Sequence, residues 1–355
     1  MKLLIISDAW HPQINGVVRT YEYLAEEIEK AGHTVKVIGP ADFKRTISMP
    51  GYAEIKLALW PYKALERMID AYKPSAIHIA TEGPLGNAAR KYCLRHSRLF
   101  TTSFHTHFPD YIAKRAAKIC PLLYKPFHAM AKSFIRRFHA PASAMMIATQ
   151  SLEDELRSWD FKTPISRLTR GVNLSQFFPG EKTLFNDLPR PISIYVGRVA
   201  IEKNIEKFLE MQWEGSKVIV GDGPSMQELK DKYPDAVFVG PKVGEELAAH
   251  YRSADLFVFP SKTDTFGIVL IEALASGLPV AAYDVTGPKD IITEDFLGTL
   301  TQDEDLSQAA AKALKAPGSA QKRADHVKNY YTWETAADQF LTTVKDIRTV
   351  EKKRA

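Results

Sequence analysis

The 355 residues of the chain are enough for about two domains of roughly 150 residues each. A composition of 45% hydrophobic and 25% charged residues, with 21 Pro and 19 Gly, excludes a disordered or low-complexity chain. The net charge is +5, but residues 1–180 hold 25 Lys and Arg against 15 Asp and Glu, whereas residues 181–355 hold 22 against 27. The basic first half therefore suits an anionic partner, whether a membrane, a nucleic acid or a phosphorylated substrate.

The chain begins with the short apolar run KLLIIS at residues 2–7, which predicts a first β-strand. A signal peptide would need a longer apolar region, and no stretch approaches the roughly 20 apolar residues of a membrane span. Two cysteines, Cys93 and Cys120, form no metal-binding pattern, and so few thiols are typical of a reducing compartment. We therefore expect a cytoplasmic protein.

Short apolar runs alternate with longer amphipathic stretches along the whole chain. Most of these runs are continuously apolar and end in Gly, Pro, Ser or Thr, as do parallel strands that are covered on both faces. The pattern predicts an α/β protein with two Rossmann-like, doubly wound domains. The predicted strands are residues 2–7, 34–39, 76–80, 99–104 and 145–149, then 192–197, 217–221, 236–240, 256–260 and 279–283.

The stretch FFPGEKTLFNDLPRP at residues 177–191 contains three prolines and a glycine and is the predicted linker. We place a first domain at residues 1–180 and a second at residues 181–330. Residues 331–355 are predicted to form a helix that could return to the first domain. Two such domains facing each other would form a cleft lined by the carboxyl ends of both sheets, where open α/β sheets bind their ligands.

The first motif after a predicted strand is Asn15-Gly16, which opens an amphipathic helix. A glycine at a helix start lets a phosphate approach bare amide groups, and the helix dipole favours the negative charge. A tight strand-to-helix turn would explain the same residues. The segment has no GxGxxG pattern, which disfavours a standard dinucleotide-binding domain.

Cationic and glycine motifs follow two strands of the second half. Arg198 and Lys203 come after residues 192–197 and straddle a turn where a diphosphate could bind, although isolated cations of this kind are usually solvated. Gly223, in VGDGP, offers another close backbone approach or, alternatively, a turn that caps a helix.

Two carboxylates, Asp264 and Glu272, flank the start of an apolar helix in SKTDTFGIVLIEALASG. The amides near residues 265–267 would point from the helix start toward a phosphate. An ionised carboxylate accepts two hydrogen bonds and therefore suits two vicinal ribose hydroxyls. The pair is better placed to hold two parts of one long ligand than to bind a metal. Replacing Glu272 is then expected to weaken ligand binding without lowering stability.

Taken together, the motifs resemble glycosyltransferase family 4. The stretches PQINGVVRT, SFHTHF, RGVNLSQFFP, VGRVAIEKN, GDGP and DTFGIVLIEALASGLPVAA occur in the order and spacing of that family and span nearly the whole chain. The resemblance implies the GT-B fold, with two Rossmann-like, doubly wound domains facing across a cleft. It also implies retaining transfer of a hexose from a nucleotide diphosphate sugar.

The resemblance assigns most of the donor contacts to the second domain. It implies that Glu272 binds the ribose and that Arg198 and Lys203 bind the diphosphate. It further implies that Asp264 and the backbone of Thr265, Phe266 and Gly267 contact the transferred sugar and the phosphate. Gly223 is implied to contact the donor, and Gly16 of the first domain to contact the diphosphate. His105 is implied to lie beside the reacting carbon, so His105 and Asp264 are the catalytic candidates.

Two positions depart from the family pattern. Asp264 stands where many members carry Glu, and the loss of one methylene can retune the choice of sugar. Asn173 stands where GVD is usual, which leaves a charged role at that position open.

The family implies that no divalent metal and no other cofactor is required, because fixed cations and helix amides can stabilise the leaving diphosphate. The D-x-D from Asp303 to Asp305 is better explained as a helix cap than as a metal site. No convincing nucleophile for retention is present, since Glu82 could equally orient sugar hydroxyls. The family implies a same-face displacement in which the leaving phosphate helps to deprotonate the acceptor.

Acceptors in this fold bind mainly to the first domain, where the candidates are Glu82, His107, Asp110 and Tyr111. From Tyr111 through Leu152 the chain has seven basic residues and no acid. Within this run a predicted helix has apolar residues at Phe127, Met130, Ala131, Phe134 and Phe138, flanked by Lys125, Lys132, Arg136 and Arg137. It is either an ordinary amphipathic helix with a solvated basic face or a surface that binds anionic lipid.

The motifs TEGPLG, HTHFPDY, SKTDTFG and AAYDVTGP most resemble those of bacterial members that glycosylate diacylglycerol or related lipids. We therefore expect a lipid acceptor and peripheral attachment to the inner face of the cell membrane. A UDP-sugar is the favoured donor and GDP-mannose an alternative, because base and sugar selectivity depend on Asp264 and on the loop GPKVGEE, which contains Val243.

Three other interpretations stay open. A family member with a soluble or polysaccharide acceptor would share every donor motif but would not bind liposomes. A two-domain nucleotide-sugar epimerase would share the fold and need no acceptor. A nucleic-acid binder would explain the basic half but leave Glu272 without a function, so we expect no nucleic-acid partner.

Overall fold

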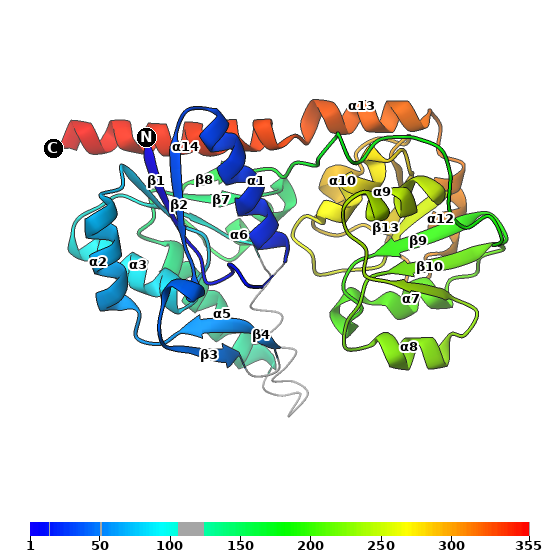
Figure 1. Cartoon of the computed structure of the whole chain (residues 1–355), viewed down its shortest axis with the longest axis horizontal. Helices are drawn as coiled ribbons and strands as arrows, with labels where there is room; N and C mark the ends of the chain where they lie inside the picture. Colours follow the sequence, from blue (N-terminus) through cyan, green and yellow to red (C-terminus); the bar gives the residue numbers. More distant parts are fainter. Residues whose placement is uncertain (14, 50–51, 106–123, 355) are drawn as a thin grey trace. The chain divides into compact units, whose positions relative to one another are not determined.

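The structure is a computed structural model that describes residues 1–13, 15–49, 52–105 and 124–354. The chain forms two compact units, each with its own parallel sheet (Figure 1). Unit 1 comprises residues 1–148, 152–169 and 333–355, and unit 2 comprises residues 149–151 and 170–332. The prediction of two Rossmann-like, doubly wound sheets is confirmed.

The six-stranded sheet of unit 1 has the order β2-β1-β5-β6-β7-β8, and all its strands are parallel. Its strands are β1 (Lys2–Ile6), β2 (Thr34–Ile38), β5 (Ala76–Ile79), β6 (Thr101–Ser103), β7 (Ala144–Ile147) and β8 (Ile165–Arg167). The sequence analysis missed β8, a half-buried edge strand with a single apolar residue. It also missed the antiparallel pair β3 (Thr46–Met49) and β4 (Tyr52–Ala58).

Side chains of β1 alternate between two cores, as the twofold repeat of a strand requires. Leu3 and Ile5 pack with Tyr21 of α1 and Phe340 of α14, whereas Leu4 and Ile6 pack in a separate cluster with α2 and α3. In Figure 1, α14 runs along unit 1, and it packs against α1. The helices lying mainly in unit 1 are α1 (Gly16–Lys30), α2 (Tyr62–Tyr72), α3 (Pro84–Arg95), α5 (Tyr124–His139), α6 (Gln150–Ser158) and α14 (Trp333–Arg354).

The six-stranded sheet of unit 2 is also parallel, in the order β11-β10-β9-β12-β13-β14. Its strands are β9 (Ile192–Val196), β10 (Ser216–Val220), β11 (Val237–Gly240), β12 (Leu256–Phe259), β13 (Val280–Tyr283) and β14 (Gly298–Thr301). Its helices are α7 (Ile205–Glu210), α8 (Met226–Lys232), α9 (Gly244–Ser253), α10 (Ile268–Ala275), α11 (Pro288–Ile291), α12 (Ser307–Leu314) and α13 (Ala320–Tyr330). The strand β14 was not predicted because its sequence, GTLT, has a single apolar side chain.

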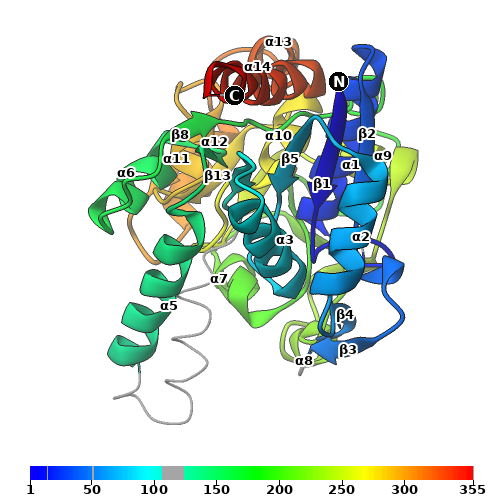
Figure 2. The ribbon, with the colours of Figure 1, turned by 90° about the vertical axis from the view of Figure 1, so that its left-hand side faces the viewer.

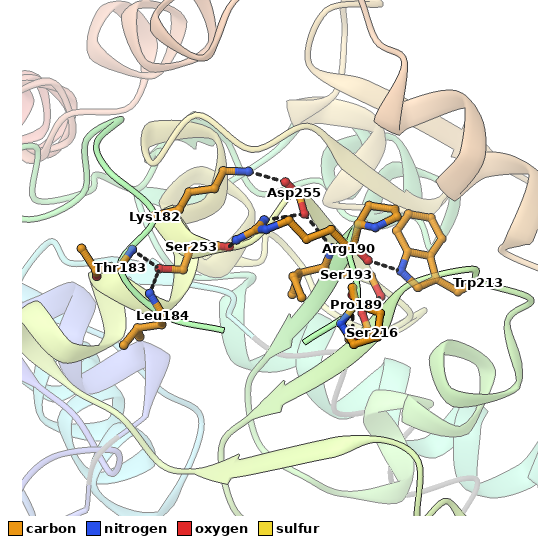
Figure 3. A network of polar contacts seen from close by, with 12 residues as sticks. Lys182, Thr183, Leu184, Pro189, Arg190, Ser193, Trp213, Ser216, Ser253 and Asp255 are labelled. Carbon is orange, nitrogen blue, oxygen red and sulfur yellow. Dashed lines mark hydrogen bonds and ion pairs between the residues drawn. The ribbon is translucent and has the colours of Figure 1, made fainter. Parts of the chain in front are cut away.

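Residues 177–191 contain no helix or strand and are tied to unit 2 by Asp255, which precedes β12 (Figure 3). The Asp255 carboxylate pairs with Lys182, accepts a hydrogen bond from Arg190 Nη1 at 2.7 Å and accepts the Ile192 amide at 2.6 Å. Burial alone would raise the pKa of Asp255, but the Ile192 amide and the Lys182 ammonium hold it below its usual value. This network fixes the entry of the chain into β9.

Candidate active site

Glu272 lies in α10, one of the most apolar helices of unit 2, and is only 6% exposed. The hydroxyl of Tyr251, at the end of α9, donates a hydrogen bond to Glu272 Oε2 at 2.9 Å. A buried carboxylate needs such partners, since burial without them is costly. Tyr251 therefore holds Glu272 in place. The sequence analysis missed Tyr251, although a buried tyrosine hydroxyl usually requires a polar partner.

The loop after β12 leads into the start of α10. Gly267 adopts a left-handed conformation with φ of +88°, which favours glycine, and the helix begins at Ile268. The loop also packs closely on Gly287, where a β-carbon would lie 2.8 Å from the carbonyl oxygen of Phe266 and 3.1 Å from that of Asp264. Thr265, Phe266 and Gly267 thus form a fixed approach to the helix start.

Lys203 and Asp264 form an ion pair in unit 2, with Lys203 Nζ 2.6 Å from Asp264 Oδ1. Each side chain is about a quarter exposed, at 25% and 24%. The second oxygen of Asp264, Oδ2, is buried and has no hydrogen-bond partner among the described residues. A buried carboxylate oxygen of this kind requires a hydrogen-bond donor, and a hydroxyl group of a bound ligand can be that donor.

The other donor candidates follow neighbouring strands of the same sheet. Arg198, exposed, comes after β9, and its carbonyl oxygen accepts a hydrogen bond from the Tyr195 hydroxyl at 2.9 Å. A β-carbon at Gly223 would lie 2.3 Å from the carbonyl oxygen of Val199, so close packing between two loops explains this glycine without a ligand. Val243 is exposed directly before α9.

The carboxyl ends of parallel strands meet at one edge of a sheet. Arg198, Gly223, Val243 and Asp264 follow β9, β10, β11 and β12 in turn, and these four strands are contiguous in the sheet of unit 2. The predicted donor residues of unit 2 are therefore gathered at one edge. They offer cations, a helix start and carboxylates, which together match a sugar joined to a diphosphate and a nucleoside.

His105 follows β6 in unit 1 and contacts a buried polar cluster. Its Nε2 atom lies 2.8 Å from the hydroxyl of Tyr21, which also lies 2.8 Å from His78 Nε2 and 3.0 Å from Ser103 Oγ. Burial lowers the pKa of His78 to about 3, so this ring is neutral at physiological pH. The sequence analysis found His105 but missed Tyr21, His78 and Ser103.

Gly16 is the first residue of α1 and is exposed. A β-carbon there would meet no atom within 4 Å, so neither crowding nor a turn requires glycine at this position. The side chain of Asn15 accepts hydrogen bonds from the amides of Val17 at 2.9 Å and Val18 at 3.1 Å. These two amides at the helix start are thus already occupied, which weakens the expected phosphate contact.

Glu82 is held by His139, whose Nε2 lies 3.2 Å from Glu82 Oε1 and whose Nδ1 lies 2.8 Å from Thr102 Oγ1. His139 is completely buried at the end of α5, so the carboxylate of Glu82 is anchored in unit 1 by a core residue. The other acceptor candidates, His107, Asp110 and Tyr111, lie outside the described residues.

The helix α5, seen as a ribbon in Figure 2, buries a different set of apolar residues from the predicted one. Ala131, Ile135 and Phe138 are buried, but Met130 and Phe134, predicted to share that face, are 59% and 42% exposed. The prediction was wrong here because the buried stripe is centred one position further along the helix and includes Ile135. An exposed apolar strip results.

The four basic residues of α5 do not have equal freedom. Lys132 Nζ lies 4.4 Å from the centre of the Trp159 ring, and Arg136 Nη1 lies 3.7 Å from Asp160 Oδ2. Lys125 and Arg137 are exposed. Along residues 1–13, 15–49, 52–105 and 124–354, no helix is both long and apolar enough to cross a membrane.

In the described part of the chain, no group of three or more His, Cys, Asp and Glu residues could hold a metal ion. Asp305 instead accepts hydrogen bonds from the amide of Ser307 at 2.9 Å and from its hydroxyl at 2.5 Å. Ser307 is the first residue of α12 and Leu306 its N-cap, so Asp305 lies just before the helix and binds its first amide.

Comparisons with known proteins concern the family and the fold of the chain. Residues 14–176 match the family described as Glycosyltransferase Family 4, and residues 181–333 match Glycosyl transferases group 1. A GDP-mannose-dependent alpha-mannosyltransferase from Mycobacterium tuberculosis is 29% identical over an alignment of 329 positions, which covers 84% of this chain and 83% of that protein. An alpha-monoglucosyldiacylglycerol synthase from Streptococcus pneumoniae is 26% identical over an alignment of 377 positions, which covers 96% of this chain and 83% of that protein.

Among solved structures, the sucrose-phosphate synthase from Thermosynechococcus elongatus is similar with a TM-score of 0.78. The two proteins are 21% identical, and the alignment covers 98% of this chain and 99% of the other. At this identity the likeness concerns the fold.

Proposed function

The chain belongs to glycosyltransferase family 4 and has the GT-B fold, and we propose that it transfers a hexose with retention from a nucleotide diphosphate sugar to a membrane lipid such as diacylglycerol. The observation that carries the donor part is the pair of acids in unit 2. Glu272 is a carboxylate fixed inside an apolar helix, and Asp264 has a buried oxygen without a partner among the described residues.

Each part of the nucleotide-sugar donor can be paired with a side chain of suitable chemistry in this arrangement. Glu272 can accept hydrogen bonds from two ribose hydroxyls, since an ionised carboxylate has several acceptor sites. Arg198 and Lys203 can neutralise the diphosphate, whose charge grows as the glycosidic bond breaks. The free oxygen of Asp264 can accept a hydroxyl of the transferred sugar. His105 would lie near the reacting carbon from the side of unit 1.

The acceptor part of the proposal rests on two supports. One relative is named as a synthase of monoglucosyldiacylglycerol, a glycolipid. In addition, Met130 and Phe134 expose apolar surface on α5 beside Arg137, a combination that favours the interface of an anionic membrane. We therefore propose peripheral attachment to the inner face of the cell membrane.

A transfer assay tests the proposed reaction. A thermal-shift panel of UDP- and GDP-sugars would first identify the donor, and the labelled sugar should then pass to diacylglycerol. We expect most of this activity to persist in excess EDTA, because Arg198, Lys203 and the start of α10 supply the electrostatic stabilisation. Activity that vanished with EDTA and returned with magnesium or manganese would contradict the proposed metal independence.

Membrane attachment is expected to depend on the exposed residues of α5. Replacing Lys125 and Arg137 by Gln and Phe134 by Ser should reduce cosedimentation with anionic liposomes, because each cation near an anionic leaflet contributes about 1 kcal/mol. Binding of the wild-type protein should weaken as salt rises, since screening shortens the reach of the charges. Donor hydrolysis in solution should not change.

A matched control removes the same number of cations elsewhere. Lys312 and Lys315 are exposed in unit 2, and their replacement by Gln should leave liposome binding unaltered. Wild-type protein that ignores anionic liposomes at low salt would argue for a soluble acceptor.

A further inference from the structure

The hydroxyl of Tyr21 is the centre of the buried polar cluster in unit 1. Tyr21 comes from α1, His78 from β5, and Thr101 and Ser103 from β6, and all four side chains are at most 2% exposed. The Tyr21 ring meets His105 edge to face, with ring centres 5.4 Å apart and planes at 82°. Tyr21 thus joins His105 to a group of buried side chains from three elements.

The hydrogen bonds of this cluster constrain which of its atoms carry hydrogens. Tyr21 has a single hydroxyl proton, which it donates to Ser103 Oγ at 3.0 Å. With that proton on Ser103, the oxygen of Tyr21 contacts His105 Nε2 at 2.8 Å as an acceptor, and this arrangement places a hydrogen on Nε2 of His105. The neutral form of His105 therefore has its unprotonated nitrogen at Nδ1.

The rest of the cluster satisfies this assignment. With its proton donated to Ser103, the Tyr21 oxygen contacts His78 Nε2 at 2.8 Å as an acceptor as well, so that nitrogen of His78 also carries a hydrogen. His78 Nδ1 is then the unprotonated nitrogen of the neutral ring and accepts a hydrogen bond from the Thr101 hydroxyl at 2.8 Å. Because burial keeps His78 neutral, the cluster presents an oriented dipole to His105 and no net charge.

We propose that Tyr21 is a positioning residue that fixes both the ring orientation and the tautomer of His105. The inference rests on the proposed function for its catalytic consequence, because only there does His105 lie beside the reacting carbon. Its structural content, the hydrogen on Nε2, stands on the hydrogen bonds alone.

The test replaces Tyr21 by Phe, which keeps the ring and removes the hydroxyl. Nitrogen NMR of protein labelled with 15N-histidine reports the tautomer of each ring, and the His105 signals are assigned with His105→Gln. We expect wild-type His105 to show the Nε2–H form and the Phe variant to show a mixture. Turnover should fall about 10-fold, the loss of one ordinary hydrogen bond, while donor affinity measured by calorimetry stays the same.

A matched control separates positioning from stability. Tyr92 is also buried in unit 1 and donates its hydroxyl to Asp70 Oδ1 at 2.6 Å, away from this cluster. Tyr92→Phe should leave the His105 tautomer and turnover as in the wild type. Ser103→Ala, which removes the acceptor of the Tyr21 proton, is a second variant should Tyr21→Phe fold poorly, and it should also perturb the His105 signals.

The outcomes are distinguishable. An unchanged His105 tautomer in both Tyr21→Phe and Ser103→Ala would overturn the inference, whatever happens to activity. A changed tautomer with unchanged turnover would uphold the positioning by Tyr21 and would instead defeat the catalytic role given to His105 under the proposed function.

Discussion

Replacing His105 by Ala is expected to lower the turnover of sugar transfer by about 100-fold or more, the range of positioned polar groups that act in a transition state. His105 belongs to unit 1, whereas Glu272, Lys203 and Asp264, the proposed donor-binding residues, belong to unit 2. Donor affinity should therefore change little. Steady-state kinetics of transfer, combined with calorimetry of donor binding, separate the two effects.

The control for this variant is His96→Ala, which removes an exposed histidine at the end of α3 in the same unit. Its turnover should match that of the wild type. Should His105→Ala lose donor affinity and turnover in equal measure, His105 would be a binding residue and not a catalytic one.

The second large effect is expected at Glu272. A hydrogen bond to a charged group contributes about 1.5–3 kcal/mol, so the loss of two ribose contacts in Glu272→Ala should weaken donor binding by about 100-fold or more. Calorimetry with the donor and with the free nucleotide should show the same loss, because the ribose is common to both. Unchanged affinity would remove Glu272 from the binding site.

The contact with Tyr251 corrects one expectation for this variant. The sequence alone suggests that stability is unaffected, but Glu272→Ala leaves the buried Tyr251 hydroxyl without this partner, at a cost of about 1–3 kcal/mol. Its melting temperature should fall. Glu272→Gln keeps an acceptor oxygen for Tyr251 and should melt closer to the wild type while still binding the donor weakly. Adding Tyr251→Phe to Glu272→Ala should recover part of the lost stability, since the buried hydroxyl that lost its contact with Glu272 is then removed as well.

The sequence predicted those parts of the fold that depend on local pattern. Continuous apolar runs located ten strands, because buried parallel strands must be apolar on both faces. The edge strands β8 and β14 were not predicted, because each contains a single apolar side chain. The buried apolar stripe of α5 was predicted one position too early for a related reason. Helical periodicity does not determine which of two neighbouring helix faces packs against the rest of the fold.

The residues of the candidate site likewise fall into those that a local sequence pattern predicts and those that it does not. Residues with a fixed place after a strand, such as Arg198 and Asp264, could be found from motifs. Tyr251 and Tyr21 could not, because their partners lie 21 and 57 to 84 residues away along the chain. Such contacts exist only after folding brings the elements together. The residues that orient a site are therefore harder to find in a sequence than those that carry its chemistry.

The course of the polypeptide through unit 1 has a consequence for synthesis on the ribosome. Leu3 and Ile5, which are synthesised long before α14, share one core with Phe340 and Val344 of that helix. That core cannot close until α14 has emerged. Unit 2, which apart from residues 149–151 is the continuous segment 170–332, can pack its own sheet earlier. The second domain of the polypeptide should thus mature before the first, the reverse of the usual order in which domains fold during translation.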